Sequence, residues 1–483
     1  MRTRFMWALV LVWLFGTFAS TGFTAAVNRT NEIGSAVISS SKIDAFKAAL
    51  NKDGFTVAEW TYGEVDVAQL VCMGALQTGY ANNAGGNYLA ITNIIQGTMV
   101  PSQFQLQLND AIVIIGRTPP PVAYFSYRSY LFSHHYDGEL MPRTLFASLG
   151  DTLNNLVIRT EGSANGNPYN QDVIVVSTAD RGIDARVRAS ALAAEFSPDI
   201  INTDVIPSSV VKLGKGRDFD SFVFLNRLSV PAPGHEQELT DYMQHPGMTV
   251  LYLSQTSTNT PLNPFPTPPL RVRGTGMSEA DLMPALGALR KAILDKYPGY
   301  KATEFTTKVW ITEWLDGIQR KKNVLGETRD TSYLRTTADF KRADDPDEFL
   351  IIFGVNHQAI GKATYSSFSV YQKEKDLGIK GLNSPDFAKY SIGVVPQNAY
   401  APYLYASKVA RNCGDDPQCI QIELPEYLQP CAEVDLSKEL FVGFRAYLEP
   451  PTAVGPNPAE LLYDQVIKFK KSSREIDRTQ LTI

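Results

Sequence analysis

The chain of 483 residues carries 45 lysines and arginines against 50 aspartates and glutamates, a formal net charge of −5. The two signs are mixed without a block of either. The sequence therefore lacks the basic patch of a nucleic-acid-binding protein, and we exclude that class. The length exceeds what one ordinary hydrophobic core organises, so two or three domains are expected.

The amino terminus has the layout of a secretory signal peptide. A basic start, MRTR, precedes an almost wholly apolar run over residues 5–19, and small residues follow up to Ala26. This run is shorter than the roughly 20 residues needed to cross a bilayer, and no later stretch is long or apolar enough. The sequence predicts a signal peptide over residues 1–26, cleaved after Gly22 or Ala26, and a soluble, secreted or periplasmic mature chain without a membrane span.

The cysteine pattern favours disulfides, because an exported chain leaves the reducing cytosol. Cys413 and Cys419 bracket a short loop of turn-forming residues and are the first expected pair, which leaves Cys72 to bond with Cys431. Four cysteines allow three pairings, so spacing alone does not decide the connectivity. A zinc site is less favoured, since it would need tighter spacing and nearby histidines.

The first part of the mature chain mixes a helix with strands. Residues 41–54 place apolar side chains on one helical face and end at Gly54, a residue suited to a helix terminus. Alternating or apolar runs predict strands in an antiparallel pattern around the turn RTPPP. These strands are expected over residues 104–116, 121–132 and 154–160.

The next segment has a different order of elements. A continuous apolar strand over 172–177 precedes a helix over 180–196 and a short strand over 199–202. This order predicts a β-α-β crossover with a parallel strand pair. Two further strands are expected on either side of a short helix over 235–243. They cover residues 221–230 and 248–254.

Proline then breaks the regular pattern, and residues 256–274 are expected to form a linker or a long surface loop. A helix is expected over 278–297, with Ser278 and Asp281 as a capping box and an apolar stripe. The last third returns to strands. They are expected over residues 349–355, 363–371, 440–448 and 461–470.

These elements together predict an α+β fold with a largely antiparallel, β-rich core, at least one β-α-β crossover and flanking helices. The expected domains follow the composition of the chain. After the signal peptide they are an N-terminal α+β domain over 27–255, the proline-rich segment, and a C-terminal β-rich α+β domain over 275–483.

One pattern occurs twice. Residues 110–132 and 347–371 each have an acidic start, an apolar strand, a glycine, a short loop, and a strand with alanine, aromatic and serine residues. One interpretation is a duplicated hairpin that forms two similar sheets around a pseudo-twofold axis. The alternative is that any two strands with period-two alternation look alike. The aligned pairs are Ala123 with Ala363, Ser126 with Ser366, and Ser129 with Ser369.

The histidines suggest a candidate metal site. His357 lies in the loop of the second repeated segment, and His134 and His135 follow the outgoing strand of the first. If antiparallel hairpins bring these ends together, three imidazoles with a nearby carboxylate would suit a divalent transition metal as cofactor. The alternative is a solvated turn and a hydrogen-bonded loop histidine, and adjacent histidines on a strand point to opposite faces.

A pair of carboxylates forms the candidate catalytic site. Asp180 ends one strand of the expected parallel pair and Asp204 follows the next, at the edge where open α/β sheets bind ligands. Paired acids hydrolyse glycosides when one protonates the leaving oxygen and the other activates water. Arg181 and Arg186 are candidate substrate-binding residues. The alternatives are a helix cap at Asp180, a turn at Asp204 and a solvated helical face.

Two classes of function follow. The first is an exported protein that binds a small molecule or a carbohydrate, and the second is a secreted hydrolase that uses the carboxylate pair or the histidine site. No Gly-x-Ser-x-Gly elbow, phosphate loop or dinucleotide fingerprint is present in the sequence. The binding protein is therefore the preferred hypothesis.

Overall fold

The computed structural model describes residues 38–471 except for residues 96, 163–165, 256–260, 342–346 and 396–397. The expected signal peptide lies outside this range. Within it, no helix is long and apolar enough to cross a membrane. The described strands form three sheets in which most neighbours are antiparallel, so the prediction of a β-rich, largely antiparallel core is confirmed.

The N-terminal half, defined here as residues 38–255, contributes one 11-stranded sheet with the order β6-β5-β10-β2-β1-β11-β4-β8-β9, in which β3 also pairs with β2 and β7 with β5. Its strands are β1 (Phe55–Glu64), β2 (Gly86–Ile95), β3 (Thr98–Pro101), β4 (Ala111–Arg117), β5 (Val122–His134), β6 (Arg143–Ala147), β7 (Leu153–Asn154), β8 (Asp172–Thr178), β9 (Ile201–Val205), β10 (Ser221–Pro231) and β11 (Thr249–Gln255). Its helices are α1 (Ser40–Lys52), α2 (Val67–Cys72), α3 (Arg181–Ala193) and α4 (Glu236–Gln244), with a 3₁₀ turn at Pro198–Ile200.

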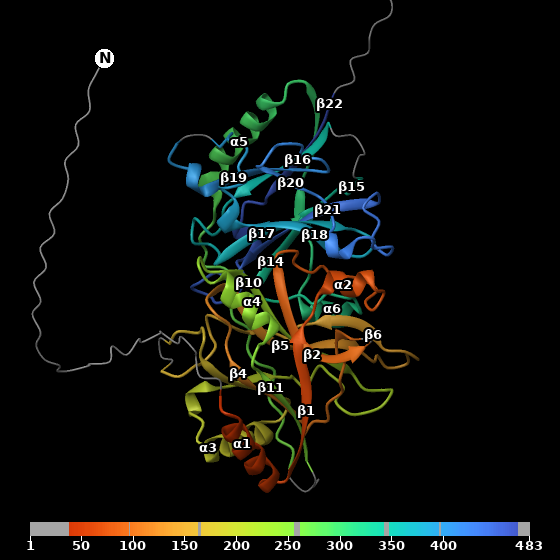
Figure 1. The fold of residues 1–483 in the computed structure, drawn as a ribbon, viewed down its shortest axis with the longest axis vertical. Coiled ribbons are helices and arrows are strands. Elements are labelled where there is room, and N and C mark those ends of the chain that lie inside the picture. The colour runs from red at the N-terminus through yellow and green to blue at the C-terminus, as the bar shows by residue number, and fades with distance from the viewer. Residues whose placement is uncertain are drawn as a thin grey trace, which may run out of the picture. The chain divides into compact units, whose positions relative to one another are not determined.

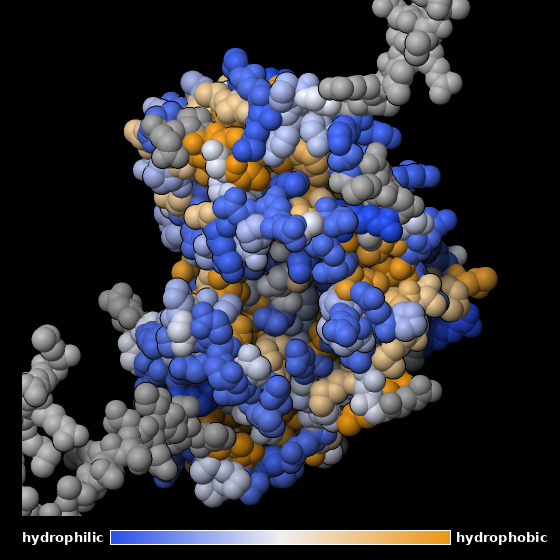
Figure 2. Space-filling model, turned by 45° about the horizontal axis from the view of Figure 1, so that its top comes forward, coloured by the Kyte–Doolittle hydropathy of each residue, from blue (hydrophilic) through white to orange (hydrophobic). Residues whose placement is uncertain are grey.

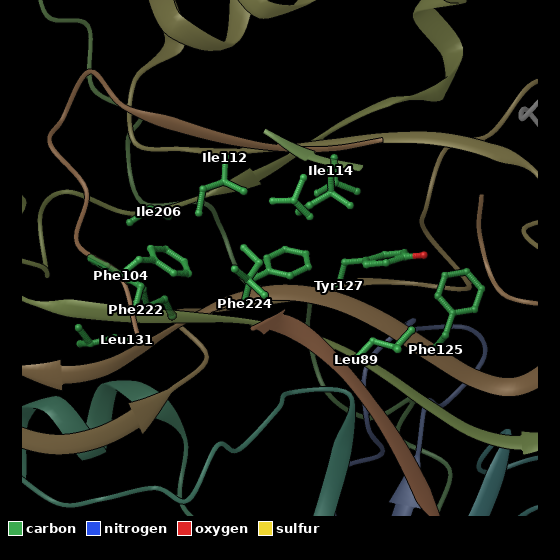
Figure 3. Packing of buried hydrophobic residues seen from close by; sticks show 14 of the residues in the cluster. Leu89, Phe104, Ile112, Ile114, Phe125, Tyr127, Leu131, Ile206, Phe222 and Phe224 are labelled. Carbon is green, nitrogen blue, oxygen red and sulfur yellow. The ribbon is translucent and has the colours of Figure 1, made fainter. Parts of the chain in front are cut away.

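This sheet folds over on itself, because β1 pairs with β11 along its first part and with β2 along its second. Figure 3 shows Ile112 and Ile114 of β4 facing aromatic side chains of the other part of the sheet, among them Phe222 and Phe224. The alternate residues of β4 pack on the opposite side against α1 and α3. Burial on both faces explains why β4 reads as a continuous apolar run.

The C-terminal half, residues 275–471, forms two sheets with the orders β12-β22-β16-β19-β20 and β13-β14-β21-β17-β18. The strands are β12 (Tyr300–Phe305), β13 (Thr307–Val309), β14 (Thr331–Thr336), β15 (Phe340–Lys341), β16 (Glu348–Val355), β17 (Tyr365–Gln372), β18 (Leu377–Asn383), β19 (Leu404–Ala410), β20 (Cys419–Gln421), β21 (Glu439–Tyr447) and β22 (Gln465–Lys471). The helices are α5 (Met283–Lys296) and α6 (Trp314–Arg320), with 3₁₀ turns at Ala280–Leu282, Ser384–Asp386, Ala401–Tyr403, Glu426–Leu428 and Pro458–Glu460.

The two C-terminal sheets pack face to face around the cluster that contains Ile352 and Phe444. Helix α5 covers the outer face of the sheet that contains β16, where Leu289 and Ile293 pack against Phe353 (Figure 1). The expected apolar stripe of this helix is therefore confirmed. Like β4, strand β16 is buried on both faces.

The two halves repeat one strand order. From β6 to β1 and on to β9, the N-terminal sheet reads β6-β5-β10-β2-β1-β11-β4-β8-β9. The C-terminal sheets can be written as β18-β17-β21-β14-β13 followed by β12-β22-β16-β19-β20, which is the same spatial order. Corresponding strands also follow one another in the same order along the chain. The single strand β1 corresponds to β12 and β13 together.

Details of register agree with this correspondence. Thr61 lies opposite Thr92 in the first half, and Thr307 lies opposite Thr336 in the second. Strands β8 and β9 pair in parallel with α3 between them in the chain, and their counterparts β19 and β20 also pair in parallel. The repeated pattern in the sequence thus belongs to two halves with one topology, which favours duplication over chance resemblance.

The expected hairpins are nevertheless wrong. Strand β4 pairs with β8 and β11, whereas β5 pairs with β6, β7 and β10, so the turn RTPPP leads from one layer of the sandwich to the other. Strands β16 and β17 are separated in the same way. The reason is burial: a strand that is apolar on both faces needs a layer on each side.

Two local predictions are also corrected. The strand expected over 154–160 ends at Asn154, because the side chains of Asn154 and Asn155 bond to backbone groups nearby instead of extending a ladder. Ser278 accepts a hydrogen bond from the backbone N–H of Ala280 at 3.2 Å, and α5 begins only at Met283 without a side-chain cap. The expected capping box does not form.

Both expected disulfides are present, Cys72 to Cys431 and Cys413 to Cys419, with Cα atoms 5.2 and 5.5 Å apart. The first joins α2 of the N-terminal half to the C-terminal half. The described residues belong to one compact unit, Val37–Ile483. The proline-rich segment coincides with the change from one set of sheets to the next, and the division into two domains there stays a prediction.

Candidate functional site

A cavity of about 90 Å³ lies between the two halves. Alternate side chains of several strands form its walls. On β10, Val223, Leu225 and Arg227 point toward the cavity, while Phe222 and Phe224 point into the core of the N-terminal half. Strands β2, β14 and β21 present one or two side chains each in the same manner. The cavity is thus lined by β10 and by its counterpart β21.

Most of the wall is apolar or aromatic. Phe132 and Phe146 are in ring contact with centroids 5.5 Å apart, and Leu76 completes this side from the segment after α2. Tyr88 from the N-terminal half and Tyr333 and Tyr447 from the C-terminal half also line the cavity. On the outer surface, Figure 2 shows apolar residues in separate patches among hydrophilic ones. The cavity is a place where apolar side chains surround an unfilled space.

Arg227 brings a positive charge to this cavity. Its Nη2 donates to the carbonyl oxygen of Gly326 in the other half, and its guanidinium lies 4.9 Å from the centre of the Tyr130 ring. The Nε atom is buried and has no hydrogen-bond partner in the described part of the chain. Arginine stays protonated in proteins, so Nε keeps its hydrogen and is an unsatisfied donor enclosed by the protein.

Arg445 adds a second positive charge from the counterpart strand. Its side chain lies in the interior, with the residue 4% exposed. Nη1 donates to the hydroxyl of Tyr371 and Nη2 to the carbonyl of Ala81. The guanidinium also lies 5.4 Å from the centre of the Tyr333 ring. All of its partners are neutral.

No carboxylate among the described residues lies within ion-pair distance of Arg227 or Arg445. A buried charge without a counter-ion is costly, and proteins normally pair it or keep it for a ligand. Arg445 is such a buried charge, Arg227 is half-buried, and both line one cavity that no carboxylate lines. An anion would find there a charge that the protein leaves uncompensated.

Unusual backbone conformations gather around the same cavity. Tyr80, Ala81, Phe146 and Leu325 all line it, and all four have positive φ angles, between 43° and 58°. Residues with bulky side chains seldom adopt this left-handed region, which costs about 1 to 3 kcal/mol each. Such strain is typical of binding sites, where the surroundings hold a residue in place for function.

The segment after α2 covers one side of the cavity and is fixed to the C-terminal half. The backbone N–H of Gly79 donates to the carbonyl of Lys375 at 2.7 Å, and that of Ala81 donates to Asp376 at 2.8 Å. A Cβ atom at Gly79 would lie 2.9 Å from the Cα of Leu377, so only glycine fits this close approach. The disulfide at Cys72 fixes the same segment.

Glu327 lies beside the cavity wall, next to Gly326, and lines a second cavity that shares Tyr333 with the first. It is 2% exposed and accepts hydrogen bonds from the backbone N–H and the hydroxyl of Ser148, at 3.0 and 2.6 Å. Burial raises the pKa of Glu327 to about 7, against the effect of these hydrogen bonds. Its charge therefore changes near neutral pH.

The predicted metal ligands do not come together. His134 Nδ1 lies 2.8 Å from Asp220, whereas His357 Nδ1 lies 2.6 Å from Glu279. The described residues contain no group of three or more histidines, cysteines or acidic residues that could hold a metal ion. The expected set of His134, His135 and His357 stays a prediction, and the observed contacts agree with the alternative of hydrogen-bonded histidines.

The predicted catalytic carboxylates have structural partners. Asp180 caps α3 by accepting hydrogen bonds from the backbone N–H groups of Gly182 and Ile183 at 2.7 and 3.0 Å. Asp204 forms an interior ion pair with Arg128 at 2.6 Å. Neither carboxylate lines the cavity between the halves. A catalytic role for the pair stays a prediction, and the observed contacts agree with the alternatives of a cap and a structural bond.

The predicted substrate-binding arginines also bond to the protein itself. Arg181 donates from Nη2 to the side chain of Asn263 at 2.8 Å. Arg186 donates from Nε to Asp53 at 2.8 Å, and its guanidinium lies 4.4 Å from the centre of the Phe55 ring. These contacts attach α3 to the proline-rich segment and to the end of α1.

The sequence interpretation missed Arg227 and Arg445. The pattern that could have found them is a cation within an otherwise apolar strand, in "SFVFLNRLSV" and "LFVGFRAYL". Alternation alone assigns each arginine to one face of its strand, but not to a shared cavity, because that needs the packing of the two halves. In comparisons with known proteins, no family model and no curated protein matches this chain.

Proposed function

We propose that this chain is an exported protein that binds a small organic anion in the cavity between its two halves. The proposal is carried by one observation: Arg227 and Arg445 face the cavity and have no carboxylate partner among the described residues. A ligand anion would supply the missing counter-charge.

The lining supports a ligand with an apolar part. Ligand sites are commonly apolar clefts with a few polar groups that fix orientation, and this cavity has aromatic and aliphatic walls with two cations. A volume of about 90 Å³ favours a compact molecule. The same features favour an organic anion over a carbohydrate, whose many hydroxyl groups would need many polar partners.

Export is supported by the two disulfides, since such bonds persist in oxidising compartments. The alternative of a secreted hydrolase has less support. Its proposed acids, Asp180 and Asp204, are engaged in a helix cap and an ion pair. Ligand binding is therefore the function that the geometry favours.

The test is calorimetric titration of the mature protein with hexanoate, benzoate and methanesulfonate. We expect at least one of these anions to bind, and Leu225→Trp, which places a larger side chain in the cavity, to weaken that binding by at least about tenfold. Leu140→Trp is the matched control, because Leu140 is 82% exposed. Binding that Leu225→Trp leaves unchanged, or no binding of any of the three, would refute the proposal.

A further inference from the structure

The two arginines differ in the donors they have left, and this difference concerns the chemistry of the ligand. Arg445 has both terminal nitrogens engaged, with Tyr371 and Ala81 as acceptors. Its guanidinium is also within 5.5 Å of the ring centres of Tyr333 and Tyr371. These contacts hold the positive charge of Arg445 in place beside the cavity.

Arg227 has fewer protein acceptors than Arg445. Only Nη2 bonds to a protein acceptor in the described residues, the carbonyl of Gly326, and the buried Nε has none. A guanidinium presents its N–H groups as a planar fork that matches the two oxygens of a carboxylate. A phosphate would bring at least one more oxygen, and beyond Arg227 the wall around it is largely apolar. The geometry favours the planar group.

The same strand indicates where the rest of the ligand lies. Leu225 and Val223 are two and four residues before Arg227 on the cavity face of β10. With about 3.4 Å per residue, these side chains lie roughly 7 and 14 Å from Arg227 along the strand. Phe132, on the neighbouring strand β5, adds to this apolar side. An apolar body that extends from the guanidinium along β10 would bury its surface there.

We propose that the ligand is a short monocarboxylate whose carboxylate binds the guanidinium of Arg227 and whose apolar body lies along Leu225 and Val223. This assignment rests on the proposed function and adds the chemical class and the orientation of the ligand. Arg445 strengthens binding through its charge, without direct hydrogen bonds to the carboxylate.

The experiment compares three probes by calorimetric titration of the mature protein: hexanoate, its neutral analogue hexanamide, and inorganic phosphate. We expect hexanoate to bind at least about tenfold more tightly than hexanamide or phosphate, as one lost charge-assisted pair predicts. Arg227→Gln should remove this preference. Arg143→Gln, at a surface position with a side chain 52% exposed, is the control that should keep it.

The outcomes separate the two proposals. If hexanamide binds as tightly as hexanoate, or phosphate binds more tightly, the carboxylate assignment is wrong while the cavity remains a ligand site. If Arg227→Gln keeps the full preference for hexanoate, Arg227 is not its partner. If Leu225→Trp has no effect on hexanoate binding, the cavity is not the site and the proposed function fails as well.

Discussion

At the scale of single residues, His357 shows how burial changes the role of an ionisable group. The residue is 2% exposed, and its ring lies between Glu279 and Asp464, at 2.6 and 3.8 Å. Burial alone would lower the pKa of His357, but the two carboxylates raise it to about 10. The imidazole is therefore a cation at neutral pH, and it holds the segment before α5 against the loop that precedes β22.

We expect His357→Gln to lower the free energy of unfolding by roughly 3 to 5 kcal/mol at pH 6, because it leaves interior carboxylates without their cation. The folded-state pKa lies above the ordinary 6.5, so this contribution is fully present below about pH 6.5 and is lost as the pH rises through about 10. Urea denaturation at pH 6, 8 and 10 measures it. His235→Gln is the control, and equal stability of both variants at pH 6 would contradict the interpretation.

At this scale the sequence predicted covalent partners better than noncovalent ones. The cysteine pairs followed from spacing and compartment, and both are confirmed. The environment of His357 did not follow, because Glu279 and Asp464 are distant in the chain and only the packing of α5 and β22 brings them together. A polar residue in a loop looks the same whether it is solvated or enclosed.

At the scale of elements, the two halves differ in how the chain connects their parallel strands. Between β8 and β9 the chain forms α3, whose apolar face packs with α1 against the sheet. Between the counterparts β19 and β20 the connection is a short loop closed by the disulfide of Cys413 with Cys419. A covalent closure thus takes the place of a packed helix.

The two disulfides should therefore differ in their effect on stability. In the chain-entropy model, the bond between Cys413 and Cys419 closes a short loop and contributes about 2 kcal/mol, whereas the bond between Cys72 and Cys431, 359 residues apart, contributes about 6 kcal/mol. We expect the double variant Cys72→Ser/Cys431→Ser to have the lower urea midpoint of the two double serine variants. The reverse order would show that native packing, not chain entropy, decides these contributions.

A clear apolar pattern predicted most of the longer elements in the described range. Among them are α1, α4, β10 and β16. Pairing was less accessible, because an apolar run does not show which layer its neighbours belong to. Strands β4 and β5 are adjacent in the chain and lie in different layers, so a hairpin was the wrong prediction. Edge strands with exposed, polar residues, such as β12, lack the apolar alternation from which a strand is predicted.

At the scale of the whole molecule, polar contacts hold the two halves together beside the cavity. Asp330, of the C-terminal half, is fully buried and accepts hydrogen bonds from Tyr124 at 2.9 Å and Asn154 at 2.8 Å, both in the N-terminal half. Glu327 and Ser148 form a similar contact. One segment of the second half therefore both holds the first half and forms part of the cavity wall.

The sequence carries only a trace of the duplication, in the two segments that contain β4 with β5 and β16 with β17. Elsewhere the halves share strand order without recognisable residues, since many apolar sequences satisfy the same buried strand. Arg227 and Arg445 lie on corresponding strands, but no residue pattern predicts that these strands face one cavity. The candidate site belongs to the junction of the halves and so could not be derived from either half alone.

This junction predicts that anion binding depends on pH through Glu327. The folded-state pKa of about 7 lies above the ordinary 4.5, so Glu327 ionises as the pH rises through 7, and Glu313 and Arg273 act on it with opposite sign. The new negative charge lies next to Gly326, the acceptor of Arg227. Hexanoate affinity should fall roughly fivefold between pH 6 and 8, as about 1 kcal/mol of repulsion predicts.

Calorimetric titration at both pH values tests this dependence, and the carboxyl group of the probe is ionised throughout the range. Glu327→Gln should remove the change in affinity, because its side chain cannot ionise. Glu304→Gln, at a surface position with a side chain 41% exposed, should keep it. If Glu327→Gln retains the same dependence, another group near the cavity carries the charge change, and Glu327 serves only to join the two halves.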